Sequence, residues 1–114
     1  MNINAYQLQA HSFADYVMPT IGTTVLSYCY PALGLAEEAG EVAGKYAKAI
    51  RDCNGMIDSE RKEAIIKELG DVTWFVAELC TTLGISLEEV MQKNIDKLTS
   101  RKERNVIHGN GDNR

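Results

Sequence analysis

The sequence lacks the cysteine pattern of a disulfide-bonded or cysteine-ligated protein. Its three cysteines, Cys29, Cys53 and Cys80, lie far apart and form no C-x-x-C pair. An odd number of widely spaced cysteines predicts no disulfide framework, and none has an evident activating partner. We therefore expect the cysteines to be small apolar core residues of a protein in a reducing compartment, the cytoplasm.

Long apolar runs are also missing. No stretch approaches the roughly 18 consecutive apolar residues that a membrane-spanning helix requires. The opening residues, MNINAYQLQAHSFADY, contain no basic region followed by an apolar core, which a secretory leader would show. We expect a soluble, unexported protein that binds no membrane.

Excess positive charge is absent as well. The formal net charge is −4, which gives no field to attract nucleic acid, although basic residues are concentrated between Lys93 and Arg104. A chain of 114 residues is long enough to bury a core and short enough to leave much of its surface exposed. We expect a single domain over residues 1–114 and no nucleic-acid partner.

No segment alternates apolar and polar residues with period two, so a sheet is not expected, whereas four segments show apolar residues at helical spacing. Pro19 interrupts the first segment, and Pro31 opens the second, because proline suits a first helical turn. Gly84 closes the third, and Ser86 with Glu89 forms a capping box for the fourth. These signals predict an all-α, four-helix bundle-like fold. Its helices are expected at residues 4–18, 31–50, 58–83 and 86–99, followed by a polar tail.

An acidic pattern is repeated on the second and third predicted helices. The segments LAEEAGEV (35–42) and IIKELGDV (65–72) align without a gap. The acids in matching positions are Glu38 with Glu68, and Glu41 with Asp71. At about 100° per residue, Glu38 and Glu68 each lie roughly 60° from the apolar stripe of their own helix. Glu41 and Asp71 each lie about 120° from that stripe, on the same side. If the helices pack antiparallel, the four carboxylates converge on one edge, with Glu37 just behind them.

Four converging carboxylates repel one another unless a cation compensates their charge. The donors are all oxygen atoms, with no histidine or cysteine three or four residues from any of these acids, so the site suits Mg²⁺, with Mn²⁺ as a substitute, rather than zinc. A di-iron bundle would need Glu-x-x-His, and the two histidines, His11 and His108, do not follow a Glu by three. Solvated helix faces are the alternative, and the two matched pairs favour the metal.

These residues also carry a family resemblance. EEAGE (37–41) followed by ELGD (68–71) resembles the E-E-x-x-E and E-x-x-D signature of MazG-type nucleotide pyrophosphohydrolases. NIDKLTSRKERNVIHGNGDNR is similar to the Asn-x-x-Lys-containing fourth helix and basic tail of MazG-like proteins, many of them encoded by phages. The resemblance begins at about Leu33 and includes no motif in the first predicted helix.

The resemblance implies an all-α fold in a homodimer or homotetramer, with Mg²⁺ held by these acids. It implies hydrolysis of nucleoside triphosphates, often deoxy or non-standard ones, to the monophosphate and pyrophosphate. Carried across by position, the metal ligands are Glu38, Glu41, Glu68 and Asp71. Glu37, a further ligand or a base acting through water, joins Glu38 and Glu41 as a candidate catalytic residue.

The triphosphate also needs cations, and the basic residues of this chain supply candidates. Those expected to bind substrate are Lys48, Asn94, Lys97, Arg101 and Arg104; of these, Asn94 and Lys97 match the family's Asn-x-x-Lys. Alternatively, the basic end of the fourth helix complements the helix dipole. Lys45 and Lys48 either hold phosphate or pair with Glu41.

Two further questions stay open from the sequence. The tail at residues 105–114 either closes over the nucleotide, contacts a partner subunit, or is disordered. The second function hypothesis is a non-catalytic helical interaction module, whose apolar stripes mediate assembly. The duplicated acidic spacing favours the enzyme, because assembly alone does not require it.

Overall fold

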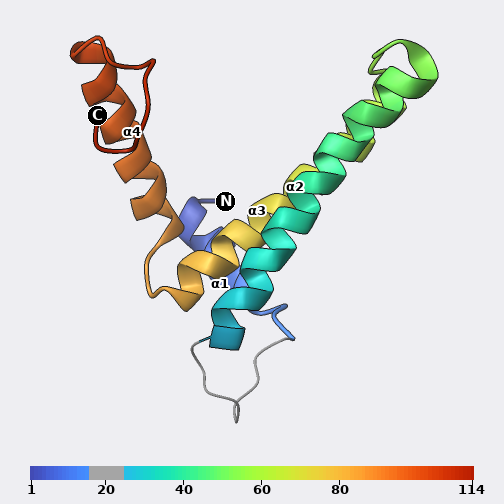
Figure 1. Cartoon of the computed structure of the whole chain (residues 1–114). Coiled ribbons are helices and arrows are strands. Elements are labelled where there is room, and N and C mark those ends of the chain that lie inside the picture. The colour runs from blue at the N-terminus through green and yellow to red at the C-terminus, as the bar shows by residue number, and fades with distance from the viewer. Residues whose placement is uncertain (16–24) are drawn as a thin grey trace.

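The computed structural model of the chain describes residues 1–15 and 25–114. The described residues form four helices and no strand (Figure 1). The helices are α1 (Ile3–His11), α2 (Val25–Cys53), α3 (Ser59–Thr82) and α4 (Leu87–Glu103). The all-α prediction is therefore confirmed.

The first helix is shorter than predicted. The expected span was 4–18, whereas α1 ends at His11, and residues 16–18 lie outside the described part of the chain. In the sequence, Phe13 continues the helical spacing of Tyr6 and Ala10, but it is largely exposed. Its helical spacing from the residues before it therefore does not reflect a buried face.

The second helix begins earlier than predicted. Its expected start was Pro31, but α2 starts at Val25 and Pro31 lies inside it. Tyr30, the residue before the proline, contacts the other helix of the hairpin: its ring centroid lies 6.3 Å from that of Phe75 on α3. Packing against α3 thus favours helix where local propensity alone predicts a helix start.

Capping fixes the starts of α3 and α4. The side chain of Asp58 accepts a hydrogen bond from the backbone N–H of Arg61 at 2.8 Å. Ser86 accepts one from the N–H of Glu89 at 3.1 Å, as the predicted capping box requires. The fourth helix continues past its predicted end to Glu103.

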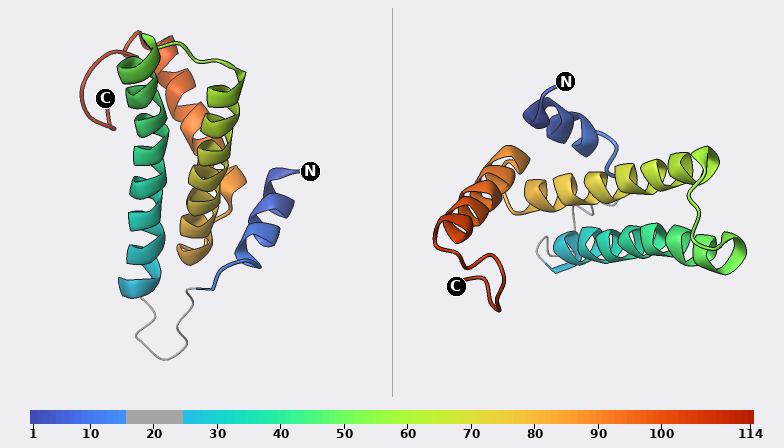
Figure 2. Two further views of the ribbon diagram at one scale, coloured as in Figure 1. Left: turned by 90° about the vertical axis from the view of Figure 1, so that its right-hand side faces the viewer. Right: turned by 90° about the horizontal axis from the view of Figure 1, so that it is seen from above.

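The helices are arranged as an antiparallel hairpin with a separate arm. The two long helices, α2 and α3, run side by side in opposite directions, and their connection contains Asn54 and Gly55 at φ values of 56° and 77° (Figures 1 and 2). The arm, α4, leaves the hairpin at an angle, so that the chain resembles a V in the view of Figure 1. Within the described residues, α4 packs against α1 and α3 and does not approach α2.

A small core lies where α1, α3 and the start of α4 meet. The indole Nε1 of Trp74 donates a hydrogen bond to the carbonyl oxygen of Ala10 at 3.1 Å, which attaches α1 to α3. Cys80 is buried here, as expected, whereas Cys29 is exposed. The buried residues are Ala10, Ala77, Cys80 and Leu87, with Ile3, Tyr6, Trp74, Val76 and Ile85 packed against them.

Gln7 holds the junction between α3 and α4 against α1. Its buried side chain accepts a hydrogen bond from the N–H of Leu87 at 2.7 Å. Its amide nitrogen lies 3.0 Å from the carbonyl oxygen of Ile85 and 3.2 Å from the hydroxyl of Thr81, and donates to both. A buried amide with all these partners fixes the direction in which α4 leaves the core.

No helix in the described part of the chain is long and apolar enough to cross a membrane.

Candidate metal centre

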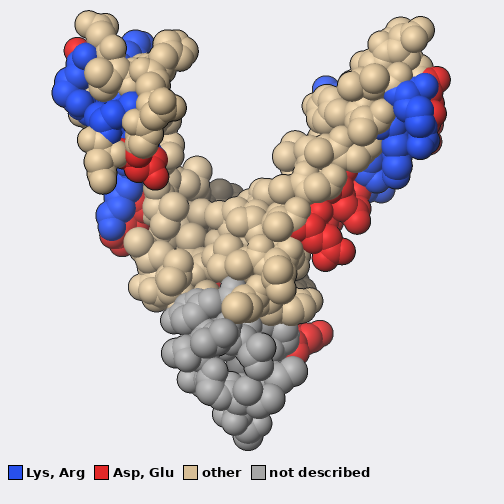
Figure 3. Space-filling model, in the orientation of Figure 1, with Lys and Arg blue, Asp and Glu red and all other residues tan. Residues whose placement is uncertain are grey.

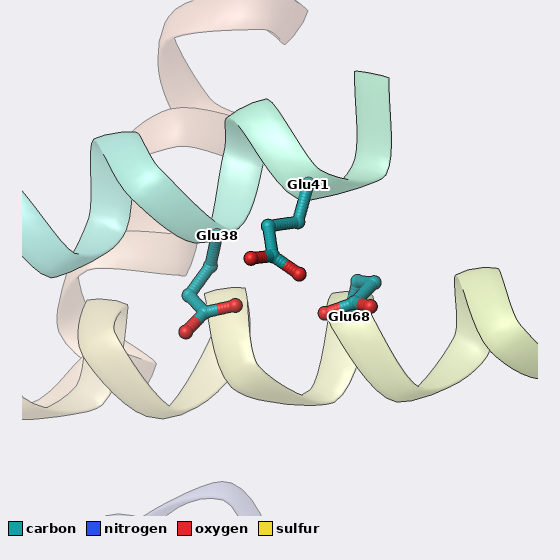
Figure 4. Close-up of side chains that lie close together, drawn as sticks. All are labelled: Glu38, Glu41 and Glu68. Atoms are coloured by element: carbon teal, nitrogen blue, oxygen red, sulfur yellow. The ribbon is translucent and has the colours of Figure 1, made fainter. Parts of the chain in front are cut away.

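Three carboxylates from two helices meet on one edge of the hairpin. Glu38 and Glu41 lie three residues apart on α2, and Glu68 faces them from α3 (Figure 4). One oxygen atom from each of the three lies within 4.8 Å of the others. Glu38 and Glu68 are partly buried and Glu41 is exposed, so a bound ion would have protein ligands on one side and solvent on the other.

The geometry follows from helical spacing and from the antiparallel packing. Residues three apart on a helix share a face, and the matching acid positions on α2 and α3 therefore point to the same edge. A methyl group added at Gly40 or Gly70 would meet no neighbouring atom within 4 Å, so no packed neighbour requires a glycine at either position.

Asp71 lies near the three clustered acids without belonging to the close group. Burial, and then the negative charge of Asp71, raises the pKa of the Glu38 carboxyl above its usual value. Weaker contributions in the same direction come from Glu41, Glu68 and Glu37. The pKa of Tyr6 on α1 is raised too, first by burial of its hydroxyl and then by the negative charge of Asp71. The sequence-predicted acids therefore share one electrostatic site that α1 borders.

Two lysines follow the acids along α2 in different environments. The ammonium of Lys45 lies 2.9 Å from a carboxylate oxygen of Glu68 on α3, so its partner is not Glu41. Lys48, one turn further on, has no ion pair within the described part of the chain. The sequence allowed Lys45 either to hold phosphate or to pair with Glu41. Its ion pair with Glu68 joins two helices, and spacing along one helix does not predict such a contact.

The other predicted substrate-binding residues lie on α4 or at its C-cap. Figure 3 shows the basic surface of α4 well separated from the acidic surface of the hairpin. Arg101 is buried, and its Nη2 donates to the carbonyl oxygen of Asp112 at 2.7 Å. Lys97 and Arg101 each lie 3.5 Å from the Asp112 carboxylate. Within one chain the tail therefore packs on this basic face, away from the acids.

The remaining two candidates lie on the same arm. The guanidinium of Arg104 donates to the Ser100 hydroxyl at 3.1 Å and to the carbonyl oxygen of Arg114 at 2.9 Å. Asn94 is exposed. Gly111 and Arg114 contact this basic face through their carbonyl oxygens, and Asp112 contacts it through its carboxylate. No helical spacing connects Asp112 to Lys97, because the chain turns back after α4.

The donor set fits a hard divalent cation. All the clustered ligand atoms are carboxylate oxygens, which Mg²⁺ and Mn²⁺ prefer, and the described residues add no sulfur or imidazole ligand to the group. A bound cation would also offset the mutual repulsion that raises the pKa of Glu38.

Metal binding is expected to weaken as the pH falls. The pKa of Glu38 is raised, so protons compete with the cation at a higher pH than for an ordinary glutamate. Linkage gives the converse for the metal-free protein: the stability contribution of Glu38 is fully present below the usual glutamate pKa and is lost as the pH rises through the raised value. Titration calorimetry with Mn²⁺ at about pH 5 and about pH 7.5 measures the first effect. Equal affinity at both values would contradict it.

Comparison with known proteins assigns the chain to a family. Residues 31–106 match the model of the MazG nucleotide pyrophosphohydrolase domain. The gene 37 protein of Mycobacterium phage L5 is 42% identical over 114 residues, which cover 100% of both chains. The uncharacterized protein YvdC of Bacillus subtilis is 38% identical over 78 residues, covering 60% of this chain and 70% of that protein. No solved structure gives a significant match. The chain therefore belongs to the MazG nucleotide pyrophosphohydrolase family.

Proposed function

We propose that this protein is a Mg²⁺-dependent pyrophosphohydrolase that converts nucleoside triphosphates, standard or modified, to monophosphates and pyrophosphate. The observation that carries the proposal is the meeting of Glu38 and Glu41 with Glu68 across the hairpin, with ligand oxygens within 4.8 Å of one another. Membership of the MazG family supports the reaction class. An acidic surface that served only for solubility would not need two helices to aim carboxylates at one point.

The acids divide into ligands and a base. Glu38, Glu41 and Glu68 would hold the ion, with Asp71 as a further ligand. The ion, when bound, supplies neutralisation of the charge that develops on the phosphate oxygens. Glu37 is exposed beside this group and accepts the proton of the attacking water. A bond forms between the water oxygen and the α-phosphorus, the bond to the bridging oxygen breaks, and pyrophosphate leaves with the electron pair.

We also propose that the working form is a homodimer or homotetramer. The radius of gyration is 17.3 Å, against about 13 Å for a compact chain of this length. The accessible surface is 8339 Å², about 2,000 Å² more than a compact monomer of this mass exposes. An excess of this size per chain is typical of obligate homodimers. The exposed apolar residues include Leu33, Tyr46, Ile50, Ile66 and Leu69 on the hairpin, and Met91, Ile95 and Leu98 on α4.

A second copy would also resolve the position of the basic arm. Because Lys97 and Arg101 lie on α4, away from the acids of the same chain, they reach a triphosphate at the metal centre only if assembly brings the arm of one protomer to the hairpin of another. Sedimentation equilibrium tests the assembly. A monomer at micromolar concentration would contradict it.

A substrate panel tests the reaction. Canonical and modified nucleoside triphosphates are incubated with the protein and Mg²⁺, and pyrophosphate and orthophosphate are measured separately. Pyrophosphate as the first product is expected, and an identically purified Glu41→Gln variant controls for contaminating phosphatases. Orthophosphate as the primary product would contradict the proposed cleavage between the α- and β-phosphates. A folded oligomer that releases neither product would favour the non-catalytic interaction module.

A further inference from the structure

A cavity lies beside the metal centre, on the side toward the connection between α2 and α3. Its volume is about 270 Å³. On the hairpin in Figure 3, a basic surface follows the acidic surface in the direction of the connection between α2 and α3. The residues lining the cavity are Lys45, Lys48, Asp52, Glu60, Arg61 and Ala64. Three of the six are cations.

The three cations have unequal partners. Lys45 pairs with Glu68 at 2.9 Å and so connects the cavity to the metal centre. Arg61 donates one hydrogen bond from Nη1 to Asp58 at 2.7 Å, and its Nε and Nη2 donate to no other residue in the described part of the chain. Lys48 forms no ion pair in the described part of the chain. Lys48 and Arg61 therefore bring donors that an anion in the cavity could occupy.

The two acids that line the cavity, Asp52 and Glu60, offset its positive charge only in part, because each also interacts with a group outside the cavity. Asp52 is held by its neighbour Arg51, which donates to both carboxylate oxygens, at 2.6 Å and 2.8 Å. That hydrogen bonding, followed by the charges of Arg51, Arg61 and Lys48, lowers the pKa of Asp52. Glu60 lies in the first turn of α3, where a carboxylate complements the helix dipole. The cavity is thus suited to an anion with several oxygen atoms.

We propose that this cavity binds the two terminal phosphates of the substrate, so that pyrophosphate is released toward the connection between α2 and α3. The inference rests on the proposed function, which places the α-phosphate at the metal centre. Lys48 lies seven residues beyond Glu41, about 10 Å along the helix axis. Because the side chains of Lys48 and Arg61 line the cavity beside the metal centre, a diphosphate group held by the metal at one end would meet them at the other.

The same placement sets the direction of the whole substrate. Of the two proposed ligands on α3, Asp71 lies farther from the connection than Glu68, and it is close enough to Tyr6 to affect its pKa. The nucleoside then extends toward α1, at the opposite end of the metal centre from the cavity. Discrimination between triphosphates and diphosphates resides in Lys48 and Arg61, because only the triphosphate fills the cavity.

Direct binding of pyrophosphate tests the subsite without requiring turnover. In titration calorimetry with Mg²⁺ present, Lys48→Gln and Arg61→Gln are expected to raise the Kd for pyrophosphate about tenfold each, the effect of losing one charge-assisted hydrogen bond. Lys48→Arg should restore most of the affinity. The matched control is Lys62→Gln, which removes an exposed charge next to Arg61 without touching the cavity. The Kd for nucleoside monophosphate should not change in any variant.

The outcomes separate this inference from the proposed function. Unchanged pyrophosphate affinity in Lys48→Gln and Arg61→Gln, or an equal loss in Lys62→Gln, would overturn the subsite. Weaker binding of the monophosphate instead of pyrophosphate would reverse the direction of the substrate and overturn it as well. Selective loss of pyrophosphate binding in a protein that hydrolyses no triphosphate would support the subsite and refute the proposed function.

Discussion

Glu38→Gln is expected to lower Mg²⁺-dependent turnover by about a hundredfold or more, an effect typical of removing a group that stabilises charge in the transition state. The amide keeps the size of the side chain but removes one of the negative charges that face Glu41 and Glu68. The fold should survive, because the ionised form of Glu38 is already disfavoured by burial and by its acidic neighbours, which raise its pKa. Initial rates at saturating Mg²⁺, with circular dichroism of the same samples, measure both effects.

A matched control for this variant is Glu63→Gln. Glu63 is exposed on α3, and the metal-ligand group does not include it. The change alters net charge by the same amount and should leave the rate within about twofold, as expected of a surface substitution. Full activity in Glu38→Gln, or an equal loss in Glu63→Gln, would remove the acidic cluster from the mechanism.

Gly34→Ala is expected to destabilise the hairpin by about 2 kcal/mol, which corresponds to a fall in Tm of roughly 10 °C for a domain of this size. Gly34 is buried on α2, and a methyl group there would overlap the ring of Phe75 on α3. That ring has little freedom to move away, because two other aromatic rings lie beside it. Its centroid lies 4.9 Å from that of the edge-on Trp74 ring and 6.3 Å from that of Tyr30. The helices must separate or the aromatic group must repack.

The control for this second prediction lies ten positions along the same helix. A methyl group at Gly44 would meet nothing within 4 Å, so Gly44→Ala should stabilise α2 by up to about 1 kcal/mol through helix propensity alone. Thermal unfolding followed by circular dichroism compares the two variants. In a double variant with Phe75→Ala, the cost of Gly34→Ala should largely disappear, because the clashing ring has been removed. Equal behaviour of the two glycine variants would contradict the close packing.

The acidic centre was predictable because helix geometry relates sequence spacing directly to a shared face. Glu38, Glu41 and Glu68 needed only the 3.6-residue period and antiparallel packing to be brought together. Asp71 shows the limit of this reasoning: its azimuth was anticipated, but the position of its carboxylate outside the close group depends on rotamers and on the distance between the helices. The roles of these acids as ligands stay a prediction.

Other features depend on contacts that no local pattern records. The early start of α2 follows from packing beside Phe75 rather than from the proline signal. The direction of α4 is set by Gln7, which donates a hydrogen bond to Ile85 and accepts one from the N–H of Leu87. Periodicity does not mark this polar residue as structural. The tail's contact with Lys97 and Arg101 through Asp112 requires the chain to reverse, which composition alone leaves open.

The measurement that bears most directly on a shared ion is Mn²⁺ binding followed by the electron paramagnetic resonance of the free ion. Glu41→Gln removes an acid from α2 and Glu68→Gln removes one from α3. If one ion is held between the helices, each change alone should weaken binding about tenfold or more, and the combined variant should retain no specific site. Tight binding that depends on the acids of one helix only would contradict the metal centre. So would wild-type binding no stronger than that of the combined Glu41→Gln and Glu68→Gln variant.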